Sequence, residues 1–199
     1  DLQEKLSECI KKGTLKGLHK QTNRAIEETD FTFVAVGTPS KPDGSIDLKY
    51  IEEAAGNIGL ALKEKETYHV IIIKSTVVPG TTQNLVKPIL EQKSNKKCGQ
   101  DFGLCMNPEF LRQGSAFNDT LNADRVVIGS YDQRSGDSLE ALYRDFYKPQ
   151  APPIIRTTLS TAELIKYASN AMLETKISFI NTIENICEKI PCADVKVVA

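Results

Sequence analysis

The chain has 199 residues, of which 40% are apolar and 26% are charged; 25 basic side chains balance 26 acidic ones for a net charge of -1. A chain of this length buries about 70% of its extended surface, so it needs no metal or disulfide to fold. The even charge argues against a nucleic-acid or membrane partner, and no apolar run is long enough to span a bilayer. We therefore expect a soluble α/β protein.

Cysteine and histidine usage argues against a metal site. The two histidines, His19 and His69, have no second ligand at metal spacing, so we expect no bound metal. No Cys-x-x-Cys pair or disulfide framework is present, which indicates free thiols in a reducing compartment, the cytoplasm. The five scattered cysteines are Cys9, Cys98, Cys105, Cys187 and Cys192.

The first third of the chain alternates helical and strand patterns. Residues 2–12 predict an amphipathic helix that Gly13 ends, and the apolar run 31–37 predicts a strand buried on both faces. Asp47 is placed to cap a helix that extends to about residue 63. A second buried strand follows over residues 69–74.

The alternation continues in the middle of the chain. Residues 81–91 predict a helix in which Pro88 implies a kink. After it the pattern predicts two strands, a helix, a proline-rich boundary and a short strand, over residues 102–106, 125–129, 135–146, 149–153 and 154–157. Such alternation favours an α/β fold with a mostly parallel sheet and flanking helices.

A long helix closes the sequence. Ser160 and Glu163 have the spacing of a capping box, and the helical pattern persists to about Ile190, where Pro191 ends it. At 1.5 Å per residue this helix would be roughly 45 Å long. Its apolar residues lie on more than one face, which is typical of connecting or dimerising helices.

Polar residues cluster directly after buried strands, in residues 36–40, 74–80 and 107–114. In open α/β sheets, ligands bind beyond the carboxyl ends of the strands, so the three segments predict one binding rim. Alternatively, their glycines, prolines and hydroxyl side chains are turn residues only. On the long helix, Lys166 and Asn170 share one face and could stabilise an oxyanion, or could be an ordinary solvated surface.

These motifs resemble those of the UDP-glucose/GDP-mannose dehydrogenase family, and they follow the family's order along the chain. The resemblance implies a Rossmann-like fold and an NAD-dependent, two-step, four-electron oxidation of the C6 alcohol of a nucleotide sugar. UDP-glucose is the first expectation, followed by GDP-mannose or a UDP-N-acetylhexosamine. The matching segments are residues 33–40, 74–81, 107–116, 125–129 and 162–170.

The resemblance also implies roles for individual residues. Glu109 would be the general acid/base, Lys166 and Asn170 would hold the reacting oxygen, and Thr76 would lie beside the nicotinamide. The substrate side would consist of Glu109, Phe110, Leu111, Arg112, Lys166 and Asn170. The cofactor side would consist of Val36, Gly37, Thr38, Pro39, Ser75 and Gln113, the last standing where many members carry a glutamate.

Two family motifs do not occur in these 199 residues: the Gly-x-Gly-x-x-Gly fingerprint and the Gly-Gly-Ser-Cys context of the nucleophile. We therefore expect an internal fragment, inactive by itself, with an incomplete NAD-binding domain over residues 1–158. Residues 159–199 would begin a middle domain that forms a homodimer through the long helix. The remaining alternatives are a β-hydroxyacid dehydrogenase relative and a non-catalytic oligomerisation module.

Overall fold

The computed structural model describes residues 2–199 and contains a five-stranded sheet in the order β1-β2-β3-β4-β5. Strands β1, β2 and β3 run parallel, β4 is antiparallel to β3, and β5 is parallel to β4. The expected α/β fold with a mostly parallel sheet is thus confirmed. The strands are β1 (Phe31–Val34), β2 (His69–Ile73), β3 (Phe102–Met106), β4 (Val126–Ser130) and β5 (Ile154–Thr157).

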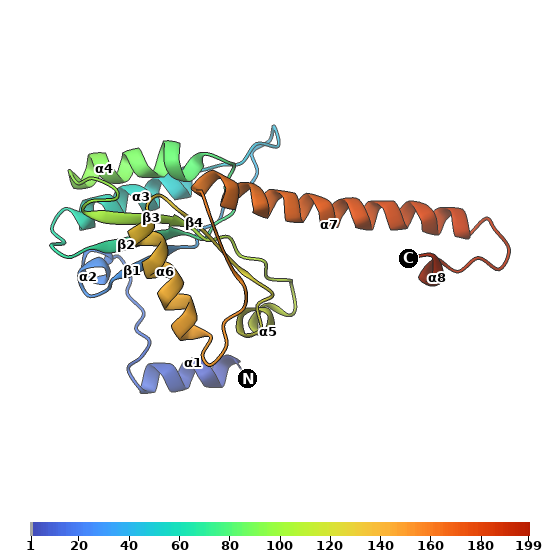
Figure 1. Ribbon diagram of the computed structural model, residues 1–199, viewed down its shortest axis with the longest axis horizontal. Helices are drawn as coiled ribbons and strands as arrows, with labels where there is room; N and C mark the ends of the chain where they lie inside the picture. Colours follow the sequence, from blue (N-terminus) through green and yellow to red (C-terminus); the bar gives the residue numbers. More distant parts are fainter. Residues whose placement is uncertain (1) are drawn as a thin grey trace.

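Helices cover both faces of the sheet (Figure 1). Residues alternate between the faces of a strand, so in β2 Ile71 and Ile73 pack into one apolar core while Val70 and Ile72 pack into another. The first core lies under α3 (Lys49–Leu62) and α4 (Lys87–Ser94), and the second under α6 (Gln133–Phe146). Shorter helices are α1 (Leu2–Lys11), α2 (Thr22–Glu27), α5 (Ala116–Leu121) and α8 (Val195–Val198).

Strand β1 differs from its prediction. It ends at Val34 rather than at Gly37, and only Val34 is buried, while Phe33 is 41% exposed. Within residues 2–199, β1 pairs with β2 alone and forms the edge of the sheet. An apolar run by itself does not tell whether both faces of a strand are covered, and here they are not.

The helix predicted over residues 81–91 begins as a π-helical turn, η1 (Thr82–Val86), and continues as α4. Pro88 lies in the first turn of α4, directly after η1. A proline at the start of an α-helix removes an N–H group that has no partner within the α-helix, so the helix tolerates it there.

The long helix α7 (Leu159–Cys187) extends away from the sheet (Figure 1). Its 29 residues correspond to about 43 Å. The predicted capping box is wrong, because Thr158 is the N-cap and accepts from the Thr161 N–H at 3.3 Å. None of the helices in residues 2–199 has the length and hydrophobicity needed to cross a membrane.

Gly129 lets the first turns of α7 approach β4 closely. A Cβ at this position would lie 2.7 Å from both the Ala162 Cβ and the Thr158 carbonyl oxygen. We expect Gly129→Ala to lower the free energy of unfolding by about 1–3 kcal/mol, because the helix must shift. In the control Gly56→Ala, the added Cβ meets nothing within 4 Å. That change within α3 should raise stability by about 0.5–1 kcal/mol. Chemical denaturation measures both, and equal effects would contradict this account.

Candidate active site

The carboxyl ends of β1 and β2 bring most of the predicted cofactor residues together. The Ser75 hydroxyl donates to the Val36 carbonyl at 2.7 Å, and the Thr38 hydroxyl donates to the Thr76 carbonyl at 2.9 Å. The segment after β1 is thereby fastened to the segment after β2. Gly37 and Pro39 lie exposed beside these contacts.

Glu109 and Lys166 meet at the end of β3 although 57 positions separate them. The Lys166 ammonium, on α7, lies 3.0 Å from the Glu109 Oε1 and donates to the Glu109 carbonyl at 2.6 Å. The other carboxylate oxygen accepts from the Leu111 N–H at 2.6 Å. Burial raises the pKa of Glu109, but the bond from Leu111 and the ammonium of Lys166 outweigh it, so the pKa lies below its usual value. The carboxylate is therefore ionised, as a general base must be.

Phe110 lies between two cations. The Arg125 guanidinium is 4.5 Å from the centre of its ring and the Lys166 ammonium is 5.5 Å from it. Cation–π attraction holds the ring, and with it the backbone next to Glu109.

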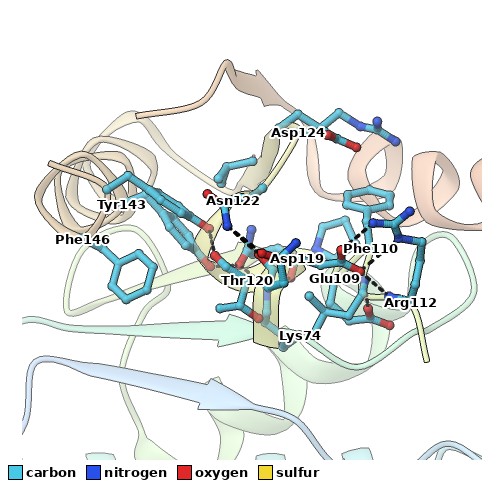
Figure 2. A pocket seen from close by; sticks show the side chains of 18 of the residues that line it. Lys74, Glu109, Phe110, Arg112, Asp119, Thr120, Asn122, Asp124, Tyr143 and Phe146 are labelled. Atoms are coloured by element: carbon cyan, nitrogen blue, oxygen red, sulfur yellow. Dashed lines mark hydrogen bonds and ion pairs between the residues drawn. The ribbon is translucent and has the colours of Figure 1, made fainter. Parts of the chain in front are cut away.

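The other predicted substrate residues lie at the periphery. The Arg112 guanidinium forms a two-bond pair with Asp119, at 2.6 and 3.1 Å, and the Arg112 N–H donates to the same carboxylate. Leu111 is exposed in this segment, and Asn170 is exposed on α7, one turn beyond Lys166. Gln113, which was predicted for the cofactor side, is exposed in the same segment, and within residues 2–199 no contact joins it to the other cofactor residues. A pocket of about 510 Å³ lies beside Glu109, Phe110 and Arg112 (Figure 2).

Lys74 also lines this pocket, although its place in the sequence did not mark it as a site residue (Figure 2). Its ammonium donates to the Asn107 Oδ1 at 2.9 Å, and the Tyr143 hydroxyl donates to the same oxygen. The Asn107 amide in turn donates to the Val127 carbonyl at 2.8 Å. A lysine after a strand is normally a solvated residue, and Tyr143 lies on α6, far along the chain from Lys74. Only the tertiary structure therefore reveals this network.

The charge of Lys74 depends on its neighbours. Burial lowers its pKa to about 8, while Glu109 raises it and Lys166 lowers it. We expect Glu109→Gln to lower the pKa of Lys74 further, because an attracting carboxylate is lost. Lys166→Met should raise it, because a repelling ammonium is lost. An NMR titration of the Lys74 ammonium group measures its pKa in both variants. If the two variants shift this pKa in the same direction, the proposed influence of Glu109 and Lys166 on Lys74 is wrong.

Two buried thiols and the possible metal ligands are further candidate reactive groups in the part of the chain that the structure describes. Burial raises the pKa of Cys98 and Cys105 to about 12, which makes both thiols poor nucleophiles. No group of three His, Cys, Asp or Glu side chains in residues 2–199 could hold a metal ion.

The residues at the strand ends are compatible with a dinucleotide. A Cβ added at Gly37 would meet nothing within 4 Å, so the backbone there is open to a ligand. The loop that carries Ser75 and Thr76 lies next to it through the two hydroxyl contacts described above. Open backbone and hydroxyl groups beyond the carboxyl ends of parallel strands are where such folds hold dinucleotides.

Two models of one protein family match the chain. The NAD binding domain of the UDP-glucose/GDP-mannose dehydrogenase family matches residues 1–147, and the central domain of that family matches residues 160–199. Together they include the strand-end segments and the helix that carries Lys166.

Two relatives and one solved structure are similar over most of the chain. GDP-mannose 6-dehydrogenase of Pseudomonas savastanoi pv. phaseolicola is 44% identical over 95% of this chain and 42% of its own length. UDP-glucose 6-dehydrogenase TuaD of Bacillus subtilis is 44% identical over 98% of the chain and 40% of its own. A GDP-mannose dehydrogenase from Pseudomonas aeruginosa, solved as a ternary complex, has a TM-score of 0.91 and 41% identity, covering 97% of this chain and 43% of that one.

The chain thus spans about two fifths of the length of these relatives. Its motifs, its fold and both domain matches agree on one family. The chain belongs to the UDP-glucose/GDP-mannose dehydrogenase family, whose members are NAD-dependent nucleotide-sugar 6-dehydrogenases.

Proposed function

We propose that the complete protein oxidises the C6 alcohol of a nucleotide sugar to a carboxylate in two steps with NAD. The observation that carries the proposal is the ion pair between Glu109 and Lys166 at the end of β3. Glu109 lies in the family segment of residues 107–116, and Lys74, directly before Ser75, donates to Asn107 at the start of that segment. An ionised carboxylate next to a fixed ammonium can accept a hydroxyl proton while the ammonium holds the oxygen.

In the proposed first step, the Glu109 carboxylate takes the proton of the C6 hydroxyl, and two electrons leave C6 with a hydride. NAD, when bound, supplies the acceptor for that hydride. Lys166, joined by Asn170 on the same helix face, donates to the sugar oxygen and stabilises its developing charge. Thr76 would contact the nicotinamide side, and the Val36–Pro39 segment with Ser75 would hold the cofactor.

The identity of the sugar and of the base rests on the comparisons rather than on the geometry of the site. UDP-glucose is the first expectation from the sequence motifs, while the similarity to the Pseudomonas aeruginosa structure favours GDP-mannose. The equal identity of 44% to relatives named for each substrate supports testing both.

An assay of the complete gene product tests the reaction. Purified protein is mixed with NAD and either UDP-glucose or GDP-mannose, and NADH is followed by absorbance. We expect two NADH for each sugar oxidised with one of the two substrates. If neither of them, nor a UDP-N-acetylhexosamine, reduces NAD, the proposed function is wrong.

We also propose a homodimer through α7 and a domain division near residue 158. Beyond its first two turns, α7 exposes large apolar side chains to water, which costs free energy. Met172, Leu173, Ile177, Phe179 and Ile186 are each at least 49% exposed. A second copy of the helix would cover them. Sedimentation of the complete protein tests the dimer, and a monomer at micromolar concentration would contradict it.

A further inference from the structure

The carboxylate of Glu163 is completely buried between α7 and the start of η1. Its Oε2 accepts from the Gly80 N–H at 2.5 Å, and its Oε1 accepts from the Thr82 N–H at 2.8 Å. Gly80 ends the loop after β2, and Thr82 begins η1. Both carboxylate oxygens of Glu163 thus accept hydrogen bonds from backbone N–H groups about 80 positions earlier in the chain.

The two sides of this contact bear different parts of the proposed active site. The loop that ends at Gly80 carries Ser75 and Thr76, on the cofactor side. On α7, Lys166 follows Glu163 by three positions, close to one helical turn, so the two side chains lie on the same face. Glu163 therefore connects the cofactor loop directly with the helix that holds the reacting oxygen.

Glu163 is not needed to cap its own helix, because Thr158 does so. A carboxylate is nevertheless the group that fits, because it offers two acceptor oxygens to two N–H donors and no donor of its own. Its negative charge also suits the N-terminal end of the helical segment formed by η1 and α4. A glutamine would offer one acceptor and turn an amide N–H toward a backbone N–H.

We propose that Glu163 is a positioning residue that sets the distance between the Thr76 loop and Lys166 during hydride transfer. The proposal rests on the proposed function. Displacements of about 1 Å in a reacting pair cost roughly 10²-fold in rate. Loss of one of the two bonds should therefore reduce the rate of the chemical step while leaving ground-state binding of sugar and cofactor nearly intact.

The test uses the complete protein and four variants: Glu163→Gln, Lys166→Met, the double variant, and Glu53→Gln as control. Glu53→Gln makes the same chemical change on an exposed residue of α3. We expect Glu163→Gln to lower kcat about 10²-fold with KM values for sugar and NAD within about twofold of wild type. The control should keep the kcat of wild type.

The double variant separates positioning from a general loss of structure. If Glu163 acts through Lys166, adding Glu163→Gln to Lys166→Met should lower kcat by less than about threefold. A full 10²-fold loss in that background, or a kcat near wild type in the single variant, overturns the proposal. A wild-type protein that reduces no NAD overturns the proposed function instead, and this role with it.

Thermal unfolding shows whether Glu163→Gln is folded. If it is not, Glu163→Asp takes its place, since it keeps both oxygens on a side chain one methylene shorter. We then expect kcat to fall about 10-fold with unchanged KM values, and an unaffected kcat overturns the proposal.

Discussion

Replacing Glu109 with glutamine should lower kcat of the complete protein by about 10²–10⁴-fold, the largest effect that we expect of any single substitution. Glutamine keeps the size and one acceptor of the side chain but does not take a proton. The glutamine oxygen can accept from only one of the two donors, the Leu111 N–H or the Lys166 ammonium, while Lys166 keeps its bond to the backbone carbonyl of residue 109. The loss of the base affects proton removal in the transition state more than ground-state binding, so KM should change little.

Steady-state and single-turnover measurements of NADH formation check this result. Glu53→Gln, on the surface of α3, serves as the matched carboxylate control and should keep wild-type rates. A Glu109→Gln enzyme that retains more than about a tenth of the wild-type kcat would remove Glu109 from the role of base.

Lys166→Met should lower kcat by about 10²–10³-fold, because it removes the donor that stabilises charge on the reacting oxygen. It should also shift the acidic side of the pH profile. In the wild type, the bond from Leu111 and the attraction of Lys166 keep the pKa of Glu109 below its usual value. Without the ammonium the pKa of Glu109 rises, so the base becomes protonated, and the rate falls, at a higher pH than in the wild type.

The dependence of kcat/KM on pH measures this shift directly. Lys176→Met removes a charge from an exposed position of the same helix, so it controls for the loss of a lysine from α7. A Lys166→Met profile whose acidic side moves to lower pH, or does not move, would show that Lys166 does not govern the charge of Glu109.

Local sequence patterns were sufficient for the order and type of most elements. Strands β3 and β5 have the predicted bounds, since an apolar run between turn residues depends only on its nearest neighbours in the chain. The polar segment of residues 107–114 indicated Glu109 in the same way, because a segment that follows a buried parallel strand lies at the rim of the sheet whatever the rest of the fold.

The exposure of β1 and the partners of Lys74 and Glu163 were decided by the tertiary structure alone. The apolar run around Phe33 predicts a core residue, yet Phe33 is exposed and, within residues 2–199, β1 lies at an edge of the sheet. The spacing of Glu163 from Ser160 predicts a capping box, yet its carboxylate accepts from N–H groups 81 and 83 positions away in the chain. Local spacing predicts which groups a side chain could satisfy within its own helix. Which buried donors actually lack a partner, and therefore attract that side chain, depends on how distant segments pack.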